Sequence, residues 1–91
     1  MNEENKLKIL KFNLQILGNH EDEYLSHLLS VAKDKLKNQY GIEVGDSLED
    51  ADIQIQYAAY QYRKRASNDP MPKMLEEDLK SRFLRKEKEN A

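Results

Sequence analysis

Residues that break helices are scarce in this chain, and their positions constrain its fold more than any other feature. There are three Gly and two Pro among 91 residues, and they lie at Gly18, Gly41, Gly45, Pro70 and Pro72. A fold of many short strands needs a turn signal about every 8–12 residues. The shortage predicts an all-α fold, a small bundle of about four helices with a short connector between the second and third helices.

Apolar residues recur at helical spacing in the first two segments. The first helix is predicted over residues 4–17, with Gly18 as its stop, although the alternation over residues 10–16 leaves a strand open as a second interpretation. The second helix is predicted over residues 21–40, because three acidic residues suit its first turn and Gly41 ends it.

The third and fourth segments differ in how much apolar surface they carry. The third helix, predicted over residues 48–66, follows a capping box at Ser47 and contains ten uncharged residues, Ile53–Tyr62. It is apolar on two faces, so it is predicted to be buried between neighbours, one of which can be another chain. The fourth helix is predicted over residues 72–88 with a narrow stripe of Met74, Leu75, Leu79 and Phe83.

Composition excludes several classes of protein. The chain has no Cys and a net charge of −2, which excludes disulfide scaffolds and thiolate metal sites and argues against a DNA-binding domain. We expect a single soluble, intracellular domain over residues 1–91, with residues 85–91 as a charged C-terminal extension that is solvated or bound to a partner.

No arrangement of residues predicts catalysis or a cofactor. The carboxylates cluster in helix first turns, where capping and the helix dipole explain them, and no Gly-rich loop or serine elbow is present. His20, Glu23 and His27 could align on one helix face, but His20 is expected at or before the helix start and zinc needs converging ligands. We therefore predict no enzyme, no metal and no cofactor.

Tyrosines and basic residues are the candidate interaction residues. Tyr57 and Tyr60 suit a subunit interface or core packing equally well, whereas Tyr62 is expected in the core. The basic residues form two groups, residues 63–65 and a set in the last helix, and both are explained by helix C-terminal charge and a solvated face rather than by DNA contacts.

The order of these segments resembles the small head–tail connector (head completion) proteins of tailed bacteriophages. The matching pieces are LQILGNHEDEYLSHLLSVAKDKLKNQYG, then ADIQIQYAAYQYRKR, then DPMPKMLEEDLKSRFLR, and together they cover about residues 4–85. Relatives often carry a longer loop where this chain has the connector at residues 42–50.

The resemblance implies a structural protein of the virion, assembled in the host cytoplasm. It implies a ring of copies beneath the portal protein that binds a downstream neck or tail-joining protein and extends the channel through which double-stranded DNA passes, without sequence-specific binding and without a membrane. Its subunit contacts are expected at Ile53, Tyr57, Tyr60, Glu43 and Val44, and its portal contacts at Arg82, Arg85 and Lys86.

Two other classes stay open on the sequence. One is a small DNA-binding regulator that uses the basic C-terminal helix, and the other is a monomeric helical adaptor. Both lack a motif of their own. The apolar third helix is better explained by a building block that buries surface on another subunit.

Overall fold

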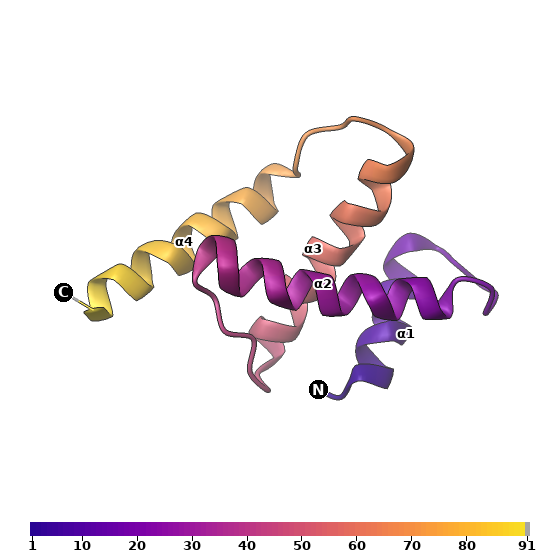
Figure 1. Ribbon diagram of the computed structural model, residues 1–91, viewed down its shortest axis with the longest axis horizontal. Helices are drawn as coiled ribbons and strands as arrows, with labels where there is room; N and C mark the ends of the chain where they lie inside the picture. Colours follow the sequence, from indigo (N-terminus) through magenta and orange to yellow (C-terminus); the bar gives the residue numbers. More distant parts are fainter. Residues whose placement is uncertain (91) are drawn as a thin grey trace.

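The computed structural model describes the backbone of residues 1–90 and the side chains of residues 1–85. Over that range the chain has no strand and forms four helices, α1 (Glu3–Leu14), α2 (Asp22–Tyr40), α3 (Leu48–Ala66) and α4 (Lys73–Asn90). Figure 1 shows α3 in the middle, and α1, α2 and α4 each pack against it. The predicted all-α fold with a short connector between the second and third helices is confirmed.

Helix α1 ends at Leu14, so the prediction that it continues to residue 17 is wrong. Gln15 takes the left-handed conformation at φ 59°, and the N–H of Ile16 donates to the carbonyl of Lys11 at 2.9 Å. The left-handed Gln15 and this hydrogen bond end the helix, although Gln15 is not a glycine. Leu17, the last residue of the predicted helix, is 99% exposed. The strand interpretation of residues 10–16 is also wrong, because residues 10–14 are helical.

Helices α2 and α3 form close to the predicted bounds for the predicted reasons. Gly41 ends α2 at φ 67°, a conformation that glycine adopts without strain. Ser47 Oγ accepts a hydrogen bond from the N–H of Asp50 at 3.1 Å, which satisfies one of the free donors at the start of α3. The other half of the predicted capping box is replaced, because the Asp50 side chain binds the N–H of Gly45 at 2.8 Å.

The core surrounds α3, whose two apolar faces are both buried by this one chain. Leu10 of α1 and Leu29 of α2 are at most 1% exposed, as are Leu75 of α4 and Ala58 of α3. No second subunit is needed to cover Ile53 or Tyr57, since each is 3% exposed in the isolated chain. Any apolar surface that another subunit covers must therefore lie outside Ile53 and Tyr57.

A buried polar chain joins three helices inside this core. The ammonium of Lys6 donates to Gln54 Oε1 at 2.7 Å, and Gln54 Nε2 donates to the carbonyl of Leu29 at 2.8 Å. Lys6 also pairs with Glu3 at 3.2 Å. Burial of a cation and an amide is tolerated because each finds partners, and the chain fixes how α1, α2 and α3 meet.

Helix α4 is held by fewer apolar side chains than its sequence suggests. It starts at Lys73, one residue after Pro72. Leu75 and Leu79 are buried, but Met74 is 76% exposed and Phe83 is 43% exposed. The prediction that all four lie on one buried stripe is wrong, because Met74 lies beside Leu75 on a helix turn and faces outward.

Candidate assembly surfaces

The predicted subunit-contact residues of α3 form a tyrosine row that lies mostly inside the chain. The ring of Tyr57 meets Tyr40 edge-on at 6.3 Å between centroids and Tyr60 at 6.2 Å. Burial, with Tyr40 beside it, raises the pKa of the Tyr57 phenol. Tyr60 is only half-buried, and the Lys64 ammonium lies 5.8 Å from its ring centroid. Of these residues, Tyr60 reaches the surface and packs on the buried Tyr57. Ile53 is buried farther back along α3, beside the cleft that Arg82 and Arg85 line.

The loop between α2 and α3 is held by hydrogen bonds at both of its ends. Ile42 is 5% exposed and its N–H donates to the carbonyl of Leu36 at 2.9 Å. Glu43 is exposed and Val44 is half-buried. Glu43 therefore faces outward from this loop, whereas Val44 packs in part against the core.

The Asp50 side chain, at the start of α3, links the loop between α2 and α3 to helix α4. Its Oδ2 accepts the N–H of Gly45 at 2.8 Å, and its Oδ1 pairs with Arg82 Nη2 at 2.5 Å. Burial raises the pKa of this carboxyl, but the hydrogen bond from Gly45 and the Arg82 guanidinium outweigh burial, so the pKa is held below its ordinary value. Within the described side chains, this ion pair attaches α4 to the start of α3.

The three predicted portal contacts differ in their exposure and in their partners within the chain. The Arg82 side chain is 20% exposed and engaged with Asp50, so as the structure stands it holds α4 in place rather than pointing to a partner. Arg85 is exposed and lines a cleft of about 230 Å³ with Glu49, Asp52 and Asp78. Lys86 lies outside the described side chains.

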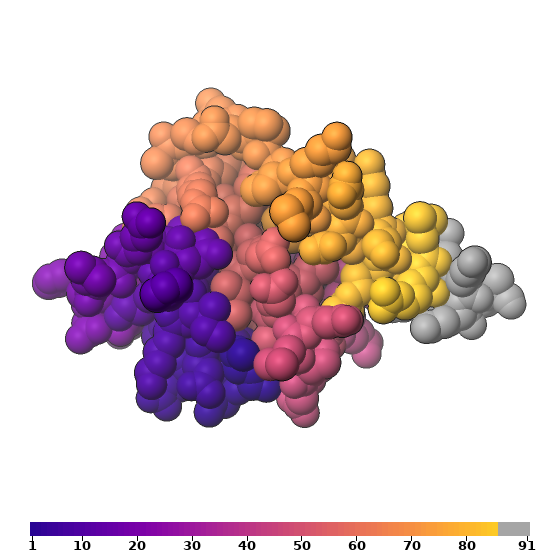
Figure 2. Space-filling model, turned by 180° about the vertical axis from the view of Figure 1, so that it is seen from behind, coloured from indigo at the N-terminus to yellow at the C-terminus, as the bar shows by residue number. Residues whose placement is uncertain are grey.

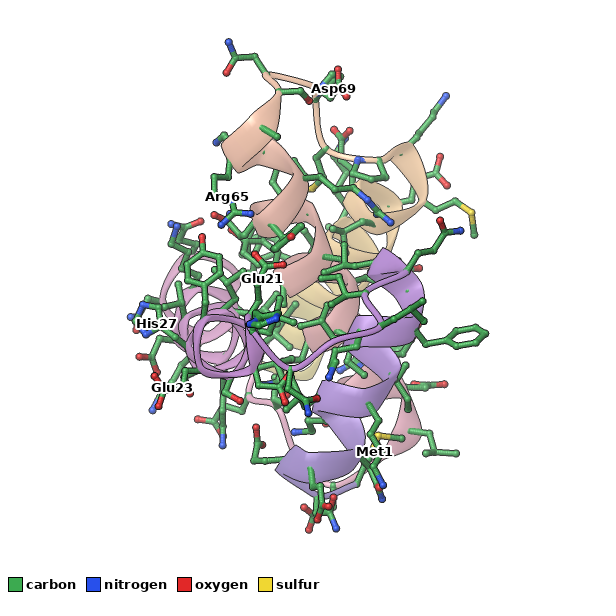
Figure 3. All side chains as sticks on the ribbon, turned by 90° about the vertical axis from the view of Figure 1, so that its right-hand side faces the viewer. Met1, Glu21, Glu23, His27, Arg65 and Asp69 are labelled. Carbon is green, nitrogen blue, oxygen red and sulfur yellow. The ribbon has the colours of Figure 1, made fainter. Side chains whose placement is uncertain are left out.

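A second polar cluster joins α2 to the end of α3, and the sequence did not reveal it. Tyr62 Oη donates to Glu21 Oε2 at 2.7 Å, and Arg65 pairs with Glu21 at 3.3 Å. The Arg65 guanidinium lies 4.5 Å from the Tyr62 ring centroid and 5.0 Å from that of Tyr24. Figure 3 shows Glu21 and Arg65 turned toward each other.

The cluster shifts the pKa values of its members. The hydrogen bond from Tyr62 lowers the pKa of Glu21 and raises that of the phenol. Burial has the largest single effect on the pKa of Arg65 and lowers it, but the hydrogen bond to Glu21 and the charge interactions with Tyr62, Tyr24 and Glu21 together outweigh it, so the net shift is upward. Because Arg65 and Arg82 are both engaged within the chain, two of the basic residues considered for DNA contacts are occupied by carboxylates.

Exposed apolar residues mark the surfaces that sequence reasoning missed. Phe12 is 86% exposed and Leu17 is 99% exposed at the end of α1, whereas Phe83 and Leu84 of α4 are 43% and 62% exposed. A large apolar patch on a small protein usually marks an interaction site. Leu17 fell within the predicted first helix and Phe83 on the predicted stripe of the last helix, so nothing in the sequence separated them from core residues.

The candidate metal ligands do not converge. His20 precedes α2, and His27 and Glu23 are exposed on that helix, with the last two labelled in Figure 3. Among the described residues, no three His, Cys, Asp or Glu side chains lie together as a metal site. In the same part of the chain, every helix is too short or too polar to cross a lipid bilayer.

A family model settles the class of protein. The model for phage gp6-like head-tail connector proteins matches residues 4–82, which include nearly all of α1 to α4 up to the Arg82 contact. The chain belongs to this family. The resemblance seen in the sequence is confirmed, and the connector is a structural component of a phage at the junction of head and tail. No curated protein and no solved structure gives a significant match to the connector.

Proposed function

We propose that the connector forms a ring beneath the portal protein, where it extends the DNA channel and presents a binding surface to the next neck or tail protein. Family membership supports the head–tail junction as its place. The observation that carries the ring is the exposed apolar surface at both α1 and α4, which a small connector would need to cover to remain soluble at working concentration.

The loop between α2 and α3 and the surface of α3 at Tyr60 are the proposed contacts with a neighbouring copy. Glu43 of the loop is exposed, and Val44 of the loop and Tyr60 of α3 are half-buried. Tyrosine at the edge of such a patch can bury its ring and keep its hydroxyl wet. Tyr57 belongs to this proposal as the buried ring on which Tyr60 packs, whereas the predicted contact residue Ile53 is buried in the core and would not touch a neighbour directly.

The last helix is the proposed arm toward the portal. Arg85 is exposed on α4, and Lys86 is placed with it by sequence alone. Arg82 contributes only if the Asp50 contact is exchanged for a partner carboxylate. Double-stranded DNA would pass the ring without sequence-specific binding, because the net charge of −2 gives little affinity for phosphate.

The test is negative-stain electron microscopy of the connector mixed with its portal protein, with sedimentation to measure the assembled mass. Tyr60→Glu combined with Val44→Glu should weaken ring formation while circular dichroism stays helical. Ser30→Glu, on an exposed position of α2, is the control and should assemble normally. Tyr57→Glu is unsuitable, because it places a charge in the core. Absence of any ring from the unmodified connector would refute the proposal.

A further inference from the structure

Helix α4 is held by less buried surface than the helices it packs with. Among the side chains of residues 1–85, α4 buries only Leu75 and Leu79, whereas α2 buries five residues and α3 buries seven. Helix α1 packs against both α2 and α3, but α4 packs mainly against α3. Figures 1 and 2 show α4 along one side of the molecule, away from α1. An element held in this way opens at a lower free energy than the core.

The part of α4 that follows Leu79 lies between two hollows. On one side is a cleft of about 230 Å³, with Glu49 and Asp52 on its α3 wall and Arg85 on its α4 wall. On the other side is a groove of about 410 Å³ between the end of α2 and α4, and Phe83 on its wall is 43% exposed. Apolar packing therefore holds the first turns of α4 but not the turns that follow.

One ion pair crosses the cleft and holds this second part of the helix. Arg82 of α4 pairs with Asp50 of α3, and the two side chains are 20% and 15% exposed. Of residues 80–85, Arg82 is the one that is not exposed. It lies three positions after the buried Leu79, so both are on the same face of α4. The pair thus continues the attachment of α4 where the apolar contacts end.

The segment before α4 has the features of a hinge. Residues 67–72 form no helix, and all of them except Met71 are exposed. The N–H of Ser67 donates to the carbonyl of Arg63 at 3.2 Å at the end of α3, and α4 begins at Lys73 after Pro72. A short exposed segment between two helices can absorb a change in backbone angles while each helix stays intact.

We propose that α4 is a hinged arm and that the Asp50–Arg82 ion pair is the latch that keeps it closed. In the closed form Asp50 occupies the Arg82 guanidinium, so this predicted portal contact is not available. Opening about residues 67–72 frees the guanidinium, and a carboxylate of the portal protein then binds it in place of Asp50. The inference rests on the proposed binding of α4 to the portal, and it adds that the isolated connector holds the arm closed.

Native-state hydrogen exchange of the isolated connector tests the hinge without the portal. The amides of α4 up to Arg82 should exchange through an opening that costs less free energy than that of α2 and depends less on urea, because less surface is exposed. Asp50→Asn should speed α4 exchange at least about tenfold, since a hydrogen bond to a charged group is worth that factor or more. Glu49→Gln is the control and should change it by no more than about fivefold.

The affinity for immobilised portal protein, measured by biolayer interferometry, tests the latch. If only the open form binds, the observed affinity is reduced in proportion to the small open fraction. Asp50→Asn should therefore bind the portal more tightly, by about the factor by which its α4 exchange is faster. Glu49→Gln removes the same charge and should bind like the unmodified connector. Arg82→Ala also opens the arm but lacks the guanidinium, so it should show no gain.

The other outcomes overturn separate parts of the inference. A single opening free energy and urea dependence for α4 and α2 would refute the hinge. Faster α4 exchange in Asp50→Asn with unchanged or weaker portal binding would refute the latch, and an equal gain in Arg82→Ala would refute Arg82 as a portal contact. If neither the unmodified connector nor any variant bound the portal, the proposed function and the portal contact would both be wrong, while hydrogen exchange would still decide whether α4 opens.

Discussion

Replacing Asp50 by Asn should lower the unfolding free energy of the protein, because Asp50 links the α2–α3 loop, α3 and α4. The carboxylate binds the Gly45 N–H at 2.8 Å and Arg82 at 2.5 Å. Asn has nearly the same shape and keeps one oxygen acceptor, but it cannot form the ion pair. The substitution therefore removes charge while leaving the packing around α3 unchanged.

The size of the effect follows from these two contacts. A hydrogen bond to a charged group contributes about 1.5–3 kcal/mol to stability. The Asp50 and Arg82 side chains are 15% and 20% exposed, so water weakens the pair, and Asn retains part of the bond to Gly45. We expect a loss of about 2 kcal/mol, which for a domain of this size lowers the melting temperature by about 8–16 °C.

The dependence on pH identifies the ionised carboxyl as the cause. The pKa of Asp50 in the folded connector lies below its ordinary value of 3.8, so its stabilising effect is complete above that value and is lost as the pH falls through the lowered folded pKa. The difference in unfolding free energy between the unmodified protein and Asp50→Asn should be constant near neutral pH and should vanish in strong acid. Urea titrations followed by circular dichroism at several pH values measure it.

Glu49→Gln is the matched control for this experiment. Glu49 lies in the same first turn of α3 and makes the same favourable interaction with the helix dipole, worth about 0.3–1 kcal/mol, but it is exposed. If Asp50→Asn destabilises no more than Glu49→Gln, or if its effect persists unchanged in acid, the assignment of Asp50 as the attachment of α4 is refuted.

Three further substitutions test the interior. Gln54→Leu should cost about 2–4 kcal/mol in urea unfolding because the buried Lys6 ammonium loses its partner, and a smaller loss than that of an exposed substitution would contradict the network. Leu79→Ala should cost about 2–5 kcal/mol and raise amide exchange in α4 first, whereas uniform exchange would contradict a local role for this leucine. Tyr62→Phe should remove the bond to Glu21 and return the Glu21 pKa toward its ordinary value in carboxyl NMR titration; an unchanged Glu21 titration would refute that contact.

The sequence predicted the helices well because breakers and caps are local signals. Gly41 ends α2 and Ser47 caps α3 as expected. The end of α1 was missed because Gln15, rather than Gly18, adopts the left-handed conformation, and a non-glycine residue gives no warning of this in the sequence. That one error placed Leu17 in the core instead of on the surface.

The site was harder to predict, since burial depends on which helices meet. The apolar run of α3 was rightly identified as buried on two faces, but both faces are covered within one chain, so Ile53 and Tyr57 do not reach the surface. Arg82 looked free in the sequence because Asp50 lies 32 positions away. Long-range pairs of this kind leave no periodic pattern.

The central claim is that copies of the connector build the head–tail junction by covering their exposed apolar ends on one another. Electron cryomicroscopy of the connector bound to its portal protein tests it most directly. We predict a closed ring of connector copies beneath the portal, with the exposed apolar residues of α1 and α4 covered in the assembly. A junction without this chain, or a ring in which these residues all face water, would contradict the account.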